Sequence, residues 1–441
     1  MPTTARYAEP CTIINARLFD GAQTLAAGCL RIAGDRITAL GAASIREPGD
    51  TVLDAQGGTL LPGLIDAHVH LLPGCTQLAA NFGVTTLVDQ FSKPEVIEPE
   101  LAAARRAAEG HGPARADLRT SSIGATAPNG HPTLAYAPFP YVTRPADAEP
   151  FVHARIAEGA THLKVIYDDG SGLALDIPAL EVATIEALVS AAHRAELPVV
   201  AHVSTAAGAV LVARCGVDVL AHVPFDPMSD AQVHEVAQAG LALIATLSVT
   251  DGFPSPGGEL PLATEPALAP LLPPAWRQLL AEQAQRWMPP TPPDAASALA
   301  NTRALAEAGV RVLAGTDAPN PGLVPGASLH RELAKLVRAG LAPAEALAAA
   351  TSRPAEVFGL ADRGRLQVGA RADLLLVDGD PSTNIADSQR LRSMWVAGRA
   401  AQPEAYPGSA AEEAGLAWLR ACNAQILRGI RELWPELPEP E

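Results

Sequence analysis

The sequence predicts an α/β protein, a (β/α)8 TIM-type barrel that carries a small β-sandwich domain built from both chain ends. Three observations favour this fold class. Eight short strand-like runs alternate with helical patterns through the middle of the chain. Strand-rich segments flank that middle on both sides. The chain has 441 residues, which is long enough for a large barrel with additions.

Residues 1–60 and 361–402 are expected to form the small β-sandwich domain. The N-terminal part contains CTIINARLFD, CLRIAGDRITAL and TVLDAQGGTLL, in which β-branched residues are broken by Gly and Asp-Gly turns. The later part contains GRLQVGARADLLLVDGD and RLRSMWVAGRAA, which have the same character. Because the two parts match and flank a long middle, we expect one domain made from both.

Residues 61–360 are expected to form the barrel. Its eight strand candidates are 63–70, 85–91, 118–125, 163–168, 198–204, 217–224, 241–248 and 311–318. Helical patterns such as 178–196 and 229–240 separate most of them. Two long connections, 126–146 and 249–298, follow strands three and seven and should roof a pocket, because sites in such barrels form at the carboxyl ends of the strands.

The tail, residues 403–441, is expected to be a helical extension. Its apolar residues recur near helical spacing at Leu416, Leu419, Ile426, Ile430 and Leu433. This pattern predicts packing on the body of the protein or on another subunit.

Charge and composition exclude several classes of function. There are 48 acidic and 32 basic residues, a formal net charge of −16, so nucleic acid and membrane-surface partners are not expected. No apolar stretch reaches the roughly 18 residues that span a bilayer, and the N-terminus lacks the apolar core of a signal peptide. We therefore expect a cytoplasmic protein. The 5 cysteines are scattered without CxxC spacing, which disfavours disulfides and thiolate zinc.

The strongest local signal is LPGLIDAHVHLLPG, residues 61–74. His68 and His70 lie two apart at the end of a predicted strand, so both rings should face one side. Two imidazoles on one face make half a zinc site, although such a pair alone could equally be packing.

Other predicted strand ends carry further candidate ligands. Lys164 lies in strand four, His202 in strand five, His222 in strand six and Asp317 in strand eight. A buried Lys or Asp is costly unless it is paired or binds a metal. Each residue taken alone could have a purely structural role. Because five of the eight predicted strand ends supply such residues, the set as a whole favours a metal centre.

This order of His-x-His, Lys, His, His and Asp resembles the amidohydrolase superfamily in its two-metal form. The segments GASLHRELAKLVRAGLAPAEALAAATSRPAEVFGL and GTDAPNPG are similar to its imidazolonepropionase-like and prolidase-like branch, and RGRLQVGARADLLLVDGDP resembles its returning β strands. The resemblance covers about residues 10–400. It also implies a homo-oligomer, because barrels of this branch often assemble.

The resemblance implies two divalent metal ions, with zinc favoured. His68, His70 and Asp317 would bind the more buried ion, and His202 and His222 the more exposed one. Lys164 would bridge both as a carbamate formed with carbon dioxide, since an ammonium group cannot bind a cation. The two ions would lower the pKa of a bridging water to give hydroxide near neutral pH, and Asp317 would transfer its proton to the leaving group.

Substrate contacts are assigned to three further residues. His131, in the loop after strand three, resembles a histidine that prolidase-like relatives place on the substrate carbonyl. His330, in the helix after strand eight, is expected to contact the substrate or Asp317. Tyr167, three residues after Lys164, is expected to point into the pocket or to cover the metal. Prolidase-like relatives have His-Ala-Tyr at the end of strand five, where this chain has His202-Val203-Ser204. The dipeptidase specificity is therefore not implied, and Arg144 is the main candidate for binding a substrate carboxylate.

The expected activity is hydrolysis of an amide or cyclic-amide bond in a small molecule such as an N-acyl amino acid, dipeptide or lactam. The same hydroxide could attack a lactone, carbamate or phosphoester, so the metal ligands do not indicate which of these bonds is cleaved. Deamination is disfavoured because mononuclear deaminases of this fold generally lack the strand-four Lys. A non-enzymatic scaffold would be expected to have lost ligands, and all six are present.

Overall fold

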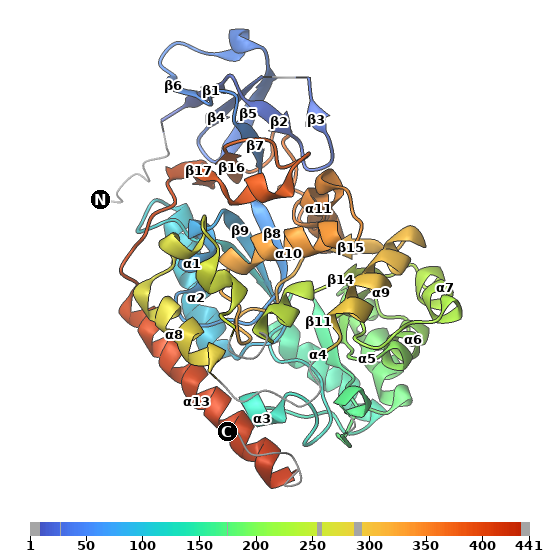
Figure 1. Ribbon diagram of the computed structural model, residues 1–441. Coiled ribbons are helices and arrows are strands. Elements are labelled where there is room, and N and C mark those ends of the chain that lie inside the picture. Colours follow the sequence, from blue (N-terminus) through green and yellow to red (C-terminus); the bar gives the residue numbers. More distant parts are fainter. Residues whose placement is uncertain (1–8, 27, 174, 254–257, 286–292, 434–441) are drawn as a thin grey trace.

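A computed structural model describes residues 9–26, 28–173, 175–253, 258–285 and 293–433 (Figure 1). Eight parallel strands lie at its centre, in two sheets ordered β10-β9-β8 and β11-β12-β13-β14-β15. They are β8 (Leu64–Val69), β9 (Val84–Asp89), β10 (Asp117–Thr120), β11 (Leu163–Ile166), β12 (Val199–His202), β13 (Val219–Ala221), β14 (Ala242–Ile244) and β15 (Arg311–Leu313). Each expected segment overlaps one of them, but the strands are shorter than expected because the backbone beyond them makes only isolated bridges.

Backbone hydrogen bonds link these two sheets at both edges. The amide of Ala67 in β8 donates to the carbonyl of Ala314 at 3.0 Å, just after β15. At the other edge, the amide of Ala125, beyond β10, donates to the carbonyl of Lys164 in β11 at 2.8 Å. The eight strands therefore follow one another in chain order from one sheet into the next.

Helices cover the outer faces of these strands. They are α1 (Cys75–Asn81), α2 (Pro94–Ala108), α4 (Ala148–Ala157), α5 (Val182–Arg194), α6 (Ala206–Arg214), α7 (Asp230–Gln238), α9 (Ala295–Glu307), α10 (Ala327–Arg338), α11 (Pro343–Ala349) and α12 (Ser352–Val357). Leu163, Val165 and Leu243 join the large apolar cluster beneath the helices, whereas Val200 and Ile244 belong to a separate cluster. Alternate residues of each strand thus serve different faces, as the two-residue period of a strand requires.

Strands from both chain ends share one sheet at the top of Figure 1. The six-stranded sheet is ordered β18-β17-β16-β7-β2-β3, and a four-stranded sheet, β5-β4-β1-β6, accompanies it. The strands are β1 (Cys11–Ile14), β2 (Arg17–Phe19), β3 (Thr24–Leu25), β4 (Cys29–Ala33), β5 (Arg36–Gly41), β6 (Thr51–Asp54), β7 (Thr59–Pro62), β16 (Leu374–Val377), β17 (Leu391–Val396) and β18 (Arg399–Ala401). One apolar cluster joins the two sheets and includes Ile13, Leu60 and Trp395.

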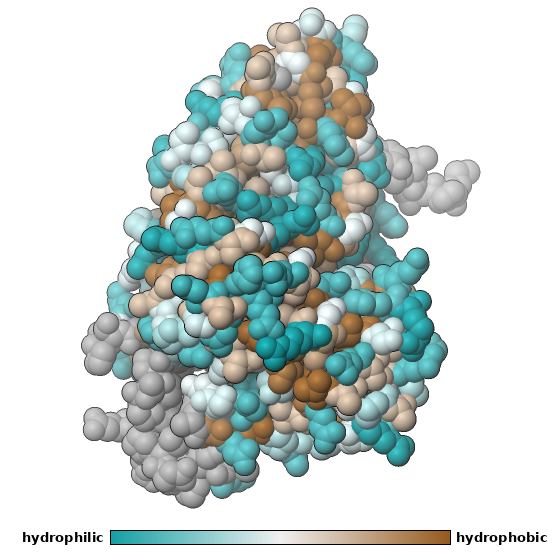
Figure 2. Space-filling model, turned by 90° about the vertical axis from the view of Figure 1, so that its right-hand side faces the viewer, coloured by the Kyte–Doolittle hydropathy of each residue, from teal (hydrophilic) through white to brown (hydrophobic). Residues whose placement is uncertain are grey.

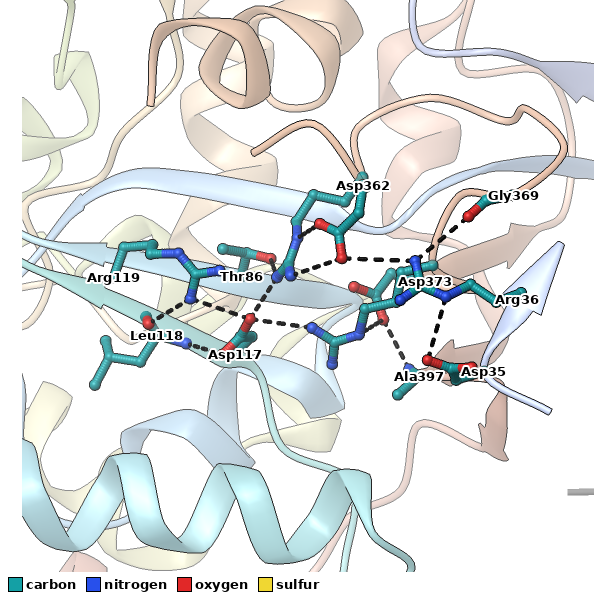
Figure 3. Close-up of polar contacts among 12 residues, drawn as sticks. Asp35, Arg36, Thr86, Asp117, Leu118, Arg119, Asp362, Gly369, Asp373 and Ala397 are labelled. Atoms are coloured by element: carbon teal, nitrogen blue, oxygen red, sulfur yellow. Dashed lines mark hydrogen bonds and ion pairs between the residues drawn. The ribbon is translucent and has the colours of Figure 1, made fainter. Parts of the chain in front are cut away.

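An ion-pair network joins this β-rich part to β10 (Figure 3). Asp117, the first residue of β10, accepts from Arg363 at 2.6 Å and from Arg371 at 3.1 Å. Arg363 also pairs with Asp362 at 2.9 Å, and Arg371 with Asp373 at 3.4 Å. The Arg363 side chain is only 5% exposed, so these carboxylates compensate for the hydration that its charge loses on burial.

The two long connections and the tail lie beside one another on the other side of the parallel strands. The first contains the short helix α3 (Thr133–Tyr136), and the second contains α8 (Pro274–Ala284), although parts of it lie outside the described residues. The tail forms α13 (Ala410–Leu433), which runs along α8 and α3 (Figure 1). Leu416 and Leu419 of α13 are buried against α8, while the side chains of Ile430 and Leu433 lie outside the described residues.

The surface carries few large apolar side chains among the described residues. Those that are exposed are Val52, Ile156, Val182, Val368 and Trp418. On the face drawn in Figure 2, apolar residues gather mainly near the top, over the β-rich part, and are otherwise interspersed with hydrophilic ones. Within the described ranges, no helix has both the length and the apolar character needed to cross a membrane.

Candidate metal centre

A cavity of about 530 Å³ opens at the carboxyl ends of the parallel strands. It brings together the six expected ligands and one of the three expected substrate residues. The members of this group are His68, His70, His131, Lys164, His202, His222 and Asp317. Because they come from five strand ends and one loop, only the tertiary fold places them together.

His68, His70 and Asp317 meet at one point. The Nε2 atoms of His68 and His70 lie 3.3 and 3.0 Å from Oδ1 of Asp317. His70 is oriented by its Nδ1, which lies 3.0 Å from the carbonyl oxygen of Phe91, so the tautomer that donates there leaves Nε2 as an acceptor. Oδ1 of Asp317 has no hydrogen-bond partner among the described residues despite its buried position. Acceptor atoms that face each other in this way fit a shared cation.

His202 and His222 form a second pair beside the first group. Nδ1 of His202 and Nε2 of His222 are 3.1 Å apart, close to the roughly 3.3 Å that separates two nitrogens bound to one tetrahedral zinc ion. Nδ1 of His222 lies 2.6 Å from the hydroxyl of Thr246, which fixes the ring. The ligand atoms of His68, His222 and Asp317 all lie within 4.8 Å of one another, so both pairs border one polar centre.

Lys164 enters this centre from β11 as a buried amine. Its side chain is 2% exposed, and Nζ has no hydrogen-bond partner among the described residues. Burial lowers the pKa of Lys164 to about 7, although Asp317 and Asp89 oppose the effect. Burial alone would raise the pKa of Asp317, but His222, His70 and Lys164 lower it to about 2. The site therefore keeps Asp317 ionised and makes the neutral form of Lys164 accessible.

Residues behind the ligands hold β8 against the chain after β15. Asp66 accepts from the amide and hydroxyl of Thr316 at 2.9 and 2.7 Å and from the amide of His68 at 3.2 Å. A Cβ atom on Gly315 would lie 2.8 Å from Cβ of His68, so the glycine permits the close approach. Asp317 itself has a φ of +61°, a sparsely populated backbone region that surrounding bonds must maintain.

His131 lies over the second histidine pair. Its ring stacks on His202 with centroids 4.7 Å apart. Burial and the neighbouring His202 lower the pKa of His131 to about 3, so the imidazole is neutral at pH 7. A neutral ring can donate one hydrogen bond to a group in the cavity.

The structure does not bring Tyr167, His330 or Arg144 to the cavity. Tyr167 packs on the apolar cluster under the helices, near Gly208 of α6. His330 is 1% exposed, and its ring nitrogens lie 3.1 Å from the hydroxyl of Ser388 and 2.9 Å from the carbonyl of Phe82. Arg144 is an exposed residue that pairs with Asp147.

Among the cavity residues that were not singled out from the sequence, Asp168 and Tyr136 lie close to the histidines. Asp168, two residues beyond β11, lies 3.5 Å from Nε2 of His202 and accepts from the hydroxyl of Ser204 at 3.1 Å. An acid directly after a strand that carries a candidate ligand was the available signal. Tyr136 ends α3, with its ring centroid 6.0 Å from that of His70. No spacing rule predicts which loop residue reaches a site.

The parallel strands with a histidine, lysine and aspartate centre at their carboxyl ends have the arrangement expected of a metal-dependent hydrolase. The model of the amidohydrolase family matches residues 59–401, and the chain belongs to this family. It is thus a hydrolase, and the expected superfamily is confirmed.

Curated and solved relatives agree with this assignment. An imidazolonepropionase of Deinococcus deserti is 42% identical over 100 residues, which are 22% of this chain and 25% of that relative, so its activity is not carried over. A Xaa-Pro dipeptidase structure with bound methionine has a TM-score of 0.69 at 20% identity, over 89% of this chain and all of that one. Molinate hydrolase has a TM-score of 0.66 at 19% identity, over 92% and 99% of the two chains. At these identities the two structures support the fold alone.

Proposed function

We propose that this protein hydrolyses an amide or cyclic-amide bond of a small molecule at a centre that holds two divalent metal ions, with zinc favoured. The observation that carries the proposal is the convergence of six ligand-type side chains in one cavity, where Nζ of Lys164 and Oδ1 of Asp317 are buried and lack hydrogen-bond partners among the described residues. His68, His70 and Asp317 would hold one ion, and His202 and His222 the other. When bound, the ions would supply an activated water and polarise the scissile carbonyl.

Lys164 would complete the centre as a carbamate. An ammonium group among four histidines and two cations would be strongly repelled, whereas a carbamate has two oxygens and a negative charge. Its buried, unpartnered Nζ and lowered pKa support the presence of the free amine that reacts with carbon dioxide.

Two residues of the chain would handle the proton and the substrate carbonyl. Asp317, which is ionised in this environment, would accept a proton at a carboxylate oxygen and deliver it to the leaving nitrogen. His131, which is neutral, would donate a hydrogen bond from its ring to the substrate carbonyl. Both side chains line the cavity, so both are within reach of a bound molecule.

The proposal extends to the architecture that carries the site. The backbone bonds at both sheet edges support a closed (β/α)8 barrel over residues 61–360. The sheet shared by both chain ends supports a β-sandwich domain of residues 1–60 and 361–402, and α13 supports a helical extension over 403–441.

Metal analysis and a hydrolysis screen together test the function. Protein purified without added metal should contain close to two equivalents of transition metal per chain. A screen should include N-acyl amino acids, dipeptides, lactams, lactones, carbamates and phosphoesters, and we expect turnover of an amide or lactam that chelation abolishes. Exclusive turnover of lactones, carbamates or phosphoesters would overturn the choice of bond, and a chain without metal or turnover would overturn the whole proposal.

A further inference from the structure

We propose that helix α13 forms the wall of the cavity that selects the substrate, and that it takes a neutral, apolar group about the size of an aromatic ring. This inference rests on the proposed function for the position of the reacting bond. The family match ends at residue 401, so α13 lies outside the matched segment. Yet five residues of α13 line the cavity: Trp418, Leu419, Cys422, Asn423 and Ile426.

Aromatic rings connect this wall to the metal centre. The ring centroid of Tyr136 lies 6.0 Å from that of His70 and 5.8 Å from that of Trp418. The ring centroid of Phe91 lies 5.0 Å from that of Tyr136. These distances suit aromatic contact, so a further ring bound against Trp418 and Tyr136 would extend the cluster. Trp418 lines the cavity and is 42% exposed, so its ring is accessible to a bound molecule.

The charges around the cavity disfavour a substrate carboxylate near this wall. Lys164 is the one lysine or arginine among the described residues that line the cavity, and it belongs to the metal centre. The acidic side chains of the lining are Asp168, Asp226, Asp294 and Asp317. A free carboxylate against Trp418 would therefore lose hydration without gaining a cationic partner among the described residues of this wall.

Helix α13 is fixed in place rather than loosely attached. Leu416 and Leu419 are buried in the cluster with α8. The thiol of Cys422 donates to the carbonyl of Ala135 in α3 at 3.3 Å, and Arg420 pairs with Glu282 of α8 at 2.7 Å. A Cβ atom on Gly429 would lie 2.5 Å from Cδ2 of Leu134, so the helix packs closely on α3. A fixed wall can discriminate between substrates by shape.

The test measures binding rather than turnover, so its result is separate from that of the hydrolysis screen. Two ketones that cannot be hydrolysed serve as probes: 4-phenyl-2-butanone and its ring-carboxylated form, 4-(3-oxobutyl)benzoate. Calorimetric titration of the intact protein should show that the neutral ketone binds at least about ten-fold more tightly. Equal binding, or a preference for the carboxylate, would overturn the inference.

Three variants locate the selecting side chain. Trp418→Ala should weaken binding of the neutral ketone by about ten-fold, the scale of a lost hydrophobic pocket contact. Trp418→Phe keeps a ring and should stay within about three-fold of the wild type. Gln425→Ala changes an exposed residue of the same helix that does not line the cavity, and it should bind like the wild type. Wild-type affinity in folded Trp418→Ala would overturn the assignment of Trp418.

Discussion

The network around Asp117 allows a stability prediction whose size follows from the structure. Burial alone would raise the pKa of Asp117, but Arg363, Arg119 and Arg371 lower it from 3.8 to about 2. That difference corresponds to about 2 kcal/mol of stabilisation when the carboxylate is ionised. Because the side chain is 24% exposed, solvent screens it only in part. Asp117→Asn should therefore lower the free energy of unfolding at pH 7 by about 2 kcal/mol.

Urea unfolding of the wild type and the variant measures this difference. A carboxyl group with a lowered folded-state pKa stabilises the protein above its unfolded pKa and loses that effect as the pH falls. The difference in the free energy of unfolding between wild type and Asp117→Asn should therefore have its full size above about pH 4 and should shrink as the pH falls towards 2. Asp176→Asn, an exposed residue away from the network, should show no such difference. Equal stability of Asp117→Asn and wild type at pH 7 would refute the reasoning.

Three further substitutions separate chemistry from structure. Asp317→Asn should keep its metal but lose about 100-fold or more in kcat, the scale of a lost acid–base group; near-normal turnover would remove Asp317 from the mechanism. His131→Ala should weaken activity while the metal content, measured by mass spectrometry, stays unchanged, and loss of metal would instead make His131 a ligand. His330→Ala should lower the free energy of unfolding by about 2 kcal/mol, because it leaves the buried carbonyl of Phe82 unpaired, without changing KM. A raised KM at unchanged stability would place His330 at the substrate.

The strands and their polar ends could be predicted because they depend on local patterns. Alternation of side chains along a strand puts His68 and His70 on one side, and parallel strands all end at one face, which collects Lys164, His202 and His222. The same alternation explains the position of Tyr167. Lys164 and Ile166 line the cavity, whereas Val165 and Tyr167 contact the apolar cluster under the helices.

Apart from His131, which the family resemblance placed at the substrate, the cavity residues of loops and helices could not be placed from the sequence. His330 lies on a helix, and which of its faces meets the cavity depends on how that helix packs. Tyr136 reaches the cavity from the first long connection and Trp418 from the tail. The positions of both depend on the tertiary fold. The apolar spacing of the tail predicted a packed helix, but not that its neighbour would be the roof of the site.

The metal content of Lys164→Ala tests the two-metal, carbamate-bridged centre most directly. The account predicts that this variant loses at least one metal equivalent and nearly all activity, and that a small carboxylic acid in solution partly restores both. Lys164→Arg should resist the same rescue, because its guanidinium group stays charged and fills the space. Two bound metals and full activity in Lys164→Ala without any added acid would contradict the account and leave a mononuclear site of His68, His70 and Asp317.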